Sequence, residues 1–207
     1  MKNTIILFII LLFFVPFCQG QKEEKNPKND TLQLYFPIDI LDKGAHSADS
    51  GWRNAVYSGL LQTMKEPVIY RDNTNNEIYR FTWFRTFNPI VIRIEKQDNK
   101  YMLYWKQYDD VGHSSGQLIT DLQKELDENT WIEFKSLLNE IDFWNLETNQ
   151  KNQYSFDGSQ WILEGKNSFQ YHVVDQWGPN KKSKYYQICD LLIRLTGLKT
   201  SNRNKYR

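Results

Sequence analysis

Three successive stretches of the chain alternate apolar and polar side chains with a period of two residues. They are EIYRFTWFRTF (77–87), IVIRIEK (90–96) and KYMLYWKQY (100–108). Because side chains along a strand point alternately to its two faces, each stretch predicts a strand with one buried face. Asp98-Asn99 is a turn signal between the second and the third. The centre of the chain is therefore predicted to be an antiparallel meander.

Further strands are predicted on either side of this meander. EPVIYRD (66–72) and QLITDLQKEL (117–126) have the composition of strands that precede and follow it. WILEG and SFQYHVVDQW, within 161–177, predict a second hairpin joined at Lys166-Asn167. The chain is thus expected to contribute about six or seven strands.

Helical spacing of apolar side chains appears in three other segments, 50–64, 127–141 and 183–196. Asp127 is a natural N-cap for the second helix, and Gly197 suits the position just after the third. Strands that are grouped, rather than alternating with helices, indicate the α+β class. We expect an antiparallel sheet of about six or seven strands, packed on one side by two or three helices.

The first residues predict export. Residues 5–17 form an apolar run of 13 residues that follows a basic residue, which is too short to span a bilayer and typical of a signal peptide. Small residues precede a cleavage point before Gln21, so the protein is expected to be periplasmic or secreted. The alternative, a lipid anchor on Cys18, is less favoured because the bulky Phe17 precedes that cysteine.

Four regions follow from these signals: a signal peptide (1–20), a flexible polar tether (21–48), a single α+β domain (49–198) and a polar tail (199–207). After cleavage the chain has 25 Lys and Arg, since one of the 26 is Lys2, against 25 Asp and Glu. A chain with equal numbers of basic and acidic residues lacks the excess positive charge that is typical of nucleic-acid-binding proteins. No transmembrane helix is expected in the mature form.

Cysteine and motif content limit the chemistry further. Only Cys189 remains after cleavage, so neither an intramolecular disulfide nor a cysteine metal site is expected. The three histidines are far apart, and the common phosphate-loop, dinucleotide, nucleophile-elbow and zinc-protease motifs are absent. We assign no cofactor, no metal and no catalytic residue from the sequence.

The second hairpin, DGSQWILEGKNSFQYHVVDQWGP (157–179), carries most of the polar candidates. In SFQYHVVDQW, strand alternation places Phe169 and Asp175 on one face with other apolar residues, and His172 on the other. A carboxylate on an apolar face needs a backbone donor, a strand end or a cation. The expected cations for Asp175 are Arg80, Arg85 and Arg93.

Glu164 can neighbour His172 across the ladder of this hairpin. An acid beside a histidine is either a general-base pair or a cross-strand pair on a solvated face. Trp83, Trp105, Trp161 and Trp177 are either core residues or a stacking platform for a sugar or a peptide. The residues that we single out for binding are Asp157, Trp161, Glu164, His172, Asp175 and Trp177.

The segments YRFTWFRTFNPIVIRIEK, DFWNL and DGSQWILEG…YHVVDQWGP resemble a group of exported bacterial proteins of unassigned function. The resemblance spans about residues 50–198 and is most specific in the last of these segments. It implies a single domain behind a signal peptide, and no activity or catalytic residue. The sequence therefore favours a non-catalytic periplasmic or secreted module that binds a protein, peptide or glycan. The alternative is a small hydrolase with Glu164 and His172 as an acid–base pair.

Overall fold

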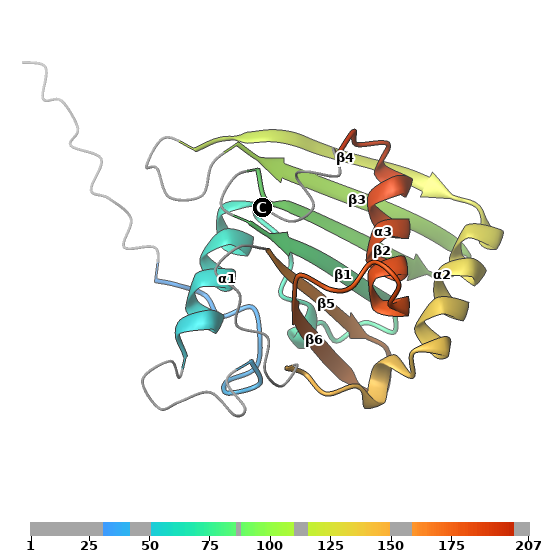
Figure 1. Cartoon of the computed structure of the whole chain (residues 1–207), viewed down its shortest axis with the longest axis horizontal. Coiled ribbons are helices and arrows are strands. Elements are labelled where there is room, and N and C mark those ends of the chain that lie inside the picture. The colour runs from blue at the N-terminus through green and yellow to red at the C-terminus, as the bar shows by residue number, and fades with distance from the viewer. Residues whose placement is uncertain (1–30, 42–50, 86–87, 110–115, 150–158, 201–207) are drawn as a thin grey trace, which may run out of the picture. The chain divides into compact units, whose positions relative to one another are not determined.

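The predicted meander and second hairpin form one sheet in the computed structural model (Figure 1). The structure describes residues 31–41, 51–85, 88–109, 116–149 and 159–200. The predicted signal peptide, Cys18, Asp157 and most of the predicted tether and tail lie outside these ranges. The strands are β1 (Glu77–Phe84), β2 (Ile90–Gln97), β3 (Lys100–Tyr108), β4 (Leu118–Leu126), β5 (Gln160–Lys166) and β6 (Tyr171–Trp177).

All neighbouring strands pair antiparallel, in the order β4-β3-β2-β1-β5-β6. The first four strands follow the chain as a meander, and the second hairpin then adds its strand β5 to the free side of β1. Trp83 lies directly opposite Trp161 in that pairing. The class and the strand count predicted from the sequence are confirmed.

Three helices pack on this sheet: α1 (Trp52–Thr63), α2 (Glu128–Glu140) and α3 (Lys184–Thr196). Asp127 caps α2 by accepting a hydrogen bond from the backbone N–H of Thr130, and Gly197 ends α3 with φ 72°. Both cap predictions are confirmed.

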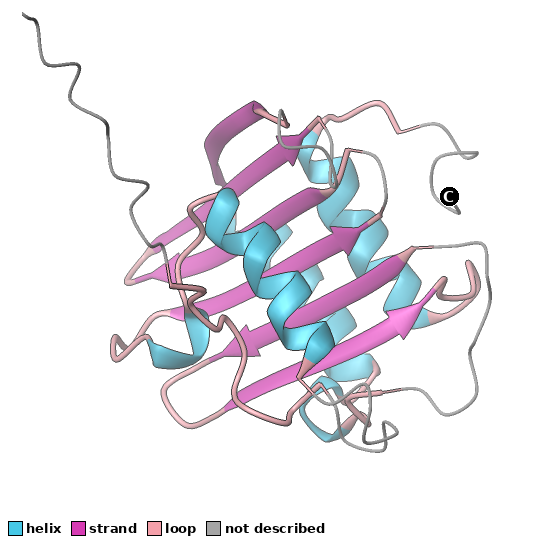
Figure 2. Ribbon diagram, turned by 90° about the vertical axis from the view of Figure 1, so that its left-hand side faces the viewer, coloured by secondary structure: helices cyan, strands magenta, loops and turns pink. Residues whose placement is uncertain are grey.

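The helices cover both faces of the sheet, so the expectation of one-sided packing was wrong. Helix α1 lies across one face, and α2 and α3 lie on the other, as Figure 2 shows from the α1 side. The reason is that the face toward α1 also carries fully buried apolar side chains, among them Ile162 and Val173. Apolar residues on both faces of a strand need cover on both faces.

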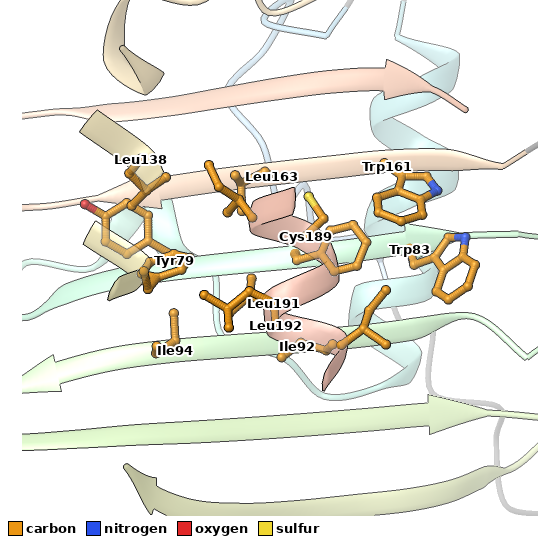
Figure 3. Packing of buried hydrophobic residues seen from close by; sticks show 14 of the residues in the cluster. Tyr79, Trp83, Ile92, Ile94, Leu138, Trp161, Leu163, Cys189, Leu191 and Leu192 are labelled. Carbon is orange, nitrogen blue, oxygen red and sulfur yellow. The ribbon is translucent and has the colours of Figure 1, made fainter. Parts of the chain in front are cut away.

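The larger core lies between the sheet and α2 and α3 (Figure 3). Three odd-numbered residues of β1, Tyr79, Phe81 and Trp83, point into it as the alternation predicted. Helix α3 contributes Cys189, Leu191 and Leu192 above them. Cys189 is fully buried, so it is a core residue here.

The smaller core, under α1, includes residues that come before that helix. Tyr35, Phe36 and Leu41 are buried there, although the sequence analysis placed them in the tether. The side chain of Asn54 donates to the carbonyls of Phe36 and Pro37, at 3.1 and 3.2 Å. These contacts join residues 35–41 to the domain.

Residues 66–72, predicted as a strand, instead contain a short 3-10 helix, Ile69–Arg71. Ile69 is buried as a strand residue would be, but the backbone N–H of Asp72 bonds to the carbonyl of Ile69 across the turn. The chain has to reverse between α1 and β1, and local i to i+3 bonds satisfy the backbone there. A second 3-10 helix, Phe143–Asn145, follows α2. Within the described residues, no helix is both long and apolar enough to cross a membrane.

Candidate functional site

Strands β5 and β6 divide the predicted binding residues between the two faces of the sheet. Glu164, Asp175 and Trp177 point toward the α1 face, and Trp161 and His172 point toward the α2 and α3 face. Asp157 lies outside the described residues. The candidates therefore do not form one site.

Glu164 and His172 are not an acid–base pair. Glu164 lies opposite Val173 in the ladder, and His172 lies opposite Gly165, so the two side chains emerge from opposite faces. The His172 ring packs against Phe143 instead, edge to face, with centroids 5.2 Å apart. The register of the β5–β6 hairpin decides that Glu164 and His172 lie on opposite faces. A shift of one residue in that register would move every side chain of one strand to the other face.

Glu164 forms a buried ion pair with Arg80 of β1. Its Oε1 lies 2.7 Å from Arg80 Nε and 2.6 Å from Nη2, and its Oε2 accepts a hydrogen bond from Tyr171 Oη at 2.8 Å. Burial raises the pKa of Glu164, and Arg80 and Tyr171 oppose that effect. The carboxylate is fully buried, so it is part of the fold and not of an accessible surface.

The ion pair belongs to a charged layer between the sheet and the end of α1. Glu66 lies 3.7 Å from Arg80, 3.1 Å from Arg93 and 3.0 Å from Lys106. Burial opposes the ionisation of Glu66, but these three cations outweigh it and hold the pKa of this carboxyl below its usual value. Lys106 also donates to the carbonyl of Met64, at 2.8 Å, near the C-terminal end of α1. The layer thus anchors the end of α1 to the sheet.

Asp175 is also held by internal partners, but none is an expected cation. Its carboxylate accepts hydrogen bonds from Gln160 Nε2 and Tyr57 Oη, and Arg53 Nη1 of α1 lies 3.8 Å away. Its backbone N–H donates to the carbonyl of Thr148 at 2.6 Å. Burial raises the pKa of Asp175 to about 6, against the opposing effect of Gln160, Arg53 and Tyr57. The group joins β6, α1 and the segment after α2.

The tryptophans on the strands do not form an exposed platform. Trp83, Trp105 and Trp161 are buried, and Trp177 is half-buried. Trp83 and Trp161 both donate their indole N–H to Ser159 Oγ, at 2.8 and 3.1 Å. The three buried tryptophans are therefore core residues.

An open cavity lies beside the start of β6, where three turns meet. It has a volume of about 400 Å³, within the range of small-ligand sites. The segments before β1, after β2 and between β5 and β6 supply its walls. Its lining residues are Asn75, Asn76, Glu77, Lys96, Asp98, Asn167, Ser168 and Phe169. We call this the tip cavity.

Phe169 is the exposed aromatic residue of the tip cavity. The sequence analysis placed it on a strand, but β6 begins at Tyr171 and residues 167–170 form the turn. Asn167 Oδ1 accepts hydrogen bonds from the backbone N–H groups of Phe169 and Gln170, at 2.8 and 3.0 Å. This turn chemistry of asparagine holds Phe169 out of the sheet, and 95% of its surface is exposed.

Lys166 holds in place the wall of the tip cavity that Asn75 and Asn76 form. Its Nζ contacts Asp72 Oδ1 at 2.8 Å and donates to the carbonyls of Thr74 and Asn76. Asp72 also accepts from the backbone N–H of Thr74, at 2.9 Å. A nearly buried ammonium group therefore fixes the turn that carries Asn75 and Asn76. A wall that internal contacts hold in place lowers the entropic cost of binding.

Sequence reasoning missed the tip cavity because its walls come from parts of the chain that are far apart. The available signal was the turn pair Asn167-Ser168, but the sequence analysis placed the turn at Lys166-Asn167 and began the next strand at Ser168. Within the described residues, no group of three or more His, Cys, Asp or Glu side chains is placed to hold a metal ion.

Comparison of the chain with protein-family models, with curated proteins and with solved structures found no match.

Proposed function

We propose that the protein is an exported, non-catalytic binding module that holds a carbohydrate in the tip cavity. The observation that carries the proposal is the almost complete exposure of Phe169 beside a polar cavity of about 400 Å³. A large apolar side chain costs free energy when it is left in water, so a ring that is 95% exposed beside a cavity favours a ligand that covers it.

The chemistry of the lining suits a neutral sugar. An aromatic face can take up the C–H face of a pyranose ring, and a few polar groups then fix its orientation. Asparagine amides and the carboxylate of Asp98 are the groups that pair with hydroxyls, since together they accept and donate hydrogen bonds. Glu77 Oε1 already accepts from Lys135 Nζ and Tyr79 Oη. The lining carries the carboxylates of Glu77 and Asp98 and the ammonium group of Lys96, and Lys135 pairs with Glu77 from outside it. The charges therefore nearly cancel, which favours an uncharged ligand over a strongly charged one.

The internal charges of the fold support a binding role over a catalytic one. Glu164 is paired with Arg80 beneath the surface, and Asp175 is enclosed by Gln160 and Tyr57. A general acid or base has to come within hydrogen-bond reach of a substrate, about 2.6–3.2 Å. Neither carboxylate offers such access.

Binding of neutral oligosaccharides tests the proposal. We expect one class among glucan, xylan, mannan and chitin oligosaccharides to shift the NMR signals of the tip cavity. Phe169→Ala should weaken that binding about tenfold, because an aromatic contact contributes roughly 1 kcal/mol or more. Phe169→Trp should preserve binding, since it keeps an aromatic face.

The matched control is Trp52→Ala, which removes another exposed aromatic residue, 62% exposed on α1 and outside the cavity. It should leave the affinity unchanged. If none of the sugars binds, the carbohydrate assignment is wrong. If a sugar binds equally well to Phe169→Ala and to the unaltered protein, the site is elsewhere.

A further inference from the structure

One oxygen of the Glu77 carboxylate is occupied by protein donors, and the other is not. Oε1 accepts hydrogen bonds from Tyr79 Oη, at 2.5 Å, and from Lys135 Nζ of α2. Within the described part of the chain, no protein donor reaches Oε2. A carboxylate oxygen has two lone pairs, so Oε2 keeps its full capacity to accept hydrogen bonds from a ligand.

Tyr79 and Lys135 fix the direction of this carboxylate. The Tyr79 ring is fully buried and packs edge to face on Phe134, with centroids 5.2 Å apart. Burial and the nearby Glu77 raise the pKa of the Tyr79 hydroxyl, so it keeps its proton and donates a hydrogen bond to the carboxylate. Lys135 Nζ also lies 2.7 Å from Tyr79 Oη, so each of the three groups contacts the other two. Glu77 therefore cannot turn without losing two hydrogen bonds.

Glu77 lines the tip cavity, whereas Tyr79 and Lys135 do not. Its side chain is 23% exposed, which leaves it within reach of a ligand. It begins β1 and lies opposite Lys96 in the ladder with β2, and both of these residues line the cavity. With Oε1 occupied from inside the protein, Oε2 is the oxygen of Glu77 that can serve a ligand there.

An acceptor of this kind suits two neighbouring hydroxyl groups. Each hydroxyl of a sugar ring donates one hydrogen bond, and Oε2 can accept two. Hydrogen bonds to an ionised acceptor are roughly twice as strong as those between neutral groups. Because the carboxylate is held in one direction, a sugar that lacks either hydroxyl leaves part of its capacity unused and binds more weakly.

We propose that Glu77 is the specificity-determining residue of the tip cavity and accepts hydrogen bonds from two adjacent hydroxyls of the sugar through Oε2. Lys135 and Tyr79 are positioning residues, because they act through Glu77 and do not line the cavity. The proposal rests on the proposed function and adds the class of sugar to it. The ring that stacks on Phe169 has to carry a free pair of adjacent hydroxyls.

Affinities of intact and deoxygenated sugars test the role of Glu77. The probes are glucan, xylan, mannan and chitin oligosaccharides, each with analogues that lack one hydroxyl of the terminal ring. The sugar that binds should lose about tenfold in affinity when either of two adjacent hydroxyls is removed. Glu77→Gln should lose as much with the intact sugar and should no longer discriminate against those analogues. The amide turns its oxygen to Lys135 and Tyr79, so a group that cannot accept takes the place of Oε2.

Lys135→Met tests the positioning role. It should weaken binding of the intact sugar several-fold and reduce the discrimination against the deoxygenated analogues. Lys135→Arg should restore both, since a guanidinium group donates hydrogen bonds to the carboxylate again. In a chain that carries Glu77→Gln, the addition of Lys135→Met should cause no further loss, because Lys135 acts through Glu77. Equal losses in both backgrounds would overturn the positioning role.

Lys184→Met is the matched control. It removes another ion pair of α2, between Lys184 Nζ and Glu140 Oε2 at 2.7 Å, and neither residue lines the cavity. This change should leave both the affinity and the discrimination as they are in the unaltered protein. Thermal unfolding establishes that each variant is folded before its binding is compared.

The outcomes separate this proposal from the carbohydrate assignment. If no sugar binds, both are wrong. If a sugar binds and depends on Phe169, but Glu77→Gln binds it as tightly as the unaltered protein, only the role of Glu77 is wrong. If Lys135→Met lowers the stability and leaves binding and discrimination unchanged, the ion pair merely attaches α2 to β1 and the positioning role is wrong.

Discussion

At the scale of single residues, Asp175 makes the stability of the protein depend on pH. Its carboxyl is buried, and burial raises its pKa from 3.8 to about 6. Between these two values the folded protein binds a proton that the unfolded chain has already released. Raising the pH through this window therefore lowers the free energy of unfolding. The total loss from this group is about 3 kcal/mol, since one pKa unit corresponds to about 1.4 kcal/mol.

We predict that Asp175→Asn removes this dependence. Asparagine has the shape of the protonated acid and cannot ionise, so the variant should be at least as stable as the unaltered protein at pH 7. The difference between the two unfolding curves should change across about pH 4–6 and become flat above it. Urea unfolding at a series of pH values measures this difference.

Asp39→Asn, on an exposed turn, is the control for removing a carboxyl without altering a buried one. It should keep the pH dependence of the unaltered protein. Should Asp175→Asn instead lose several kcal/mol at pH 7, the ionised carboxylate and its contact with Arg53 would be stabilising, contrary to this prediction.

At the scale of elements, the pairing of β1 with β5 depends on a close approach at Gly165. Gly165 lies opposite Tyr79 in the ladder. A Cβ atom at this position would lie 2.6 Å from two ring carbons of Tyr79 and 2.9 Å from a ring carbon of Phe143. The two rings fill the space that a side chain would need, so this strand position accepts only glycine without movement.

Gly165→Ala should therefore lower the free energy of unfolding by about 1–3 kcal/mol, the usual cost of overpacking a core. Thermal and urea unfolding measure the loss. Gly59→Ala is the matched control, because a Cβ placed there, in α1, meets no atom within 4 Å apart from its chain neighbours and the backbone of its own helix. That change should stabilise by about 0.5–1 kcal/mol through helix propensity. Equal effects of the two substitutions would show that the Tyr79 ring moves aside at little cost.

At the scale of the whole molecule, the proposed function requires that the protein leaves the cytoplasm. We predict cleavage before Gln21, and the intact mass of protein recovered from an exporting bacterium checks it. Cleavage there removes Cys18, so Cys18→Ser should leave the mature mass unchanged. A lipid adduct on Cys18 that is lost in Cys18→Ser would show instead that the protein is membrane-anchored.

The sequence by itself determined the elements whose signals are local. The alternation in 77–108 predicted β1, β2 and β3, and Asp127 and Gly197 predicted helix ends, because strand periodicity and caps depend on residues a few positions apart. Local signals were misleading where a turn resembled a strand, at 66–72 and at Phe169. In each case local hydrogen bonds within the turn took the place of a ladder.

Only the tertiary structure decided which distant residues meet. Arg80 pairs with Glu164, 84 positions away, and Asp175 is approached by Arg53 of α1, not by the arginines of the meander. The placement of Glu164 and His172 on opposite faces depends on hairpin register, and the tip cavity depends on three turns meeting at one end of the sheet. Register and strand order are set by the burial of side chains across the whole sheet, and no local pattern encodes that balance.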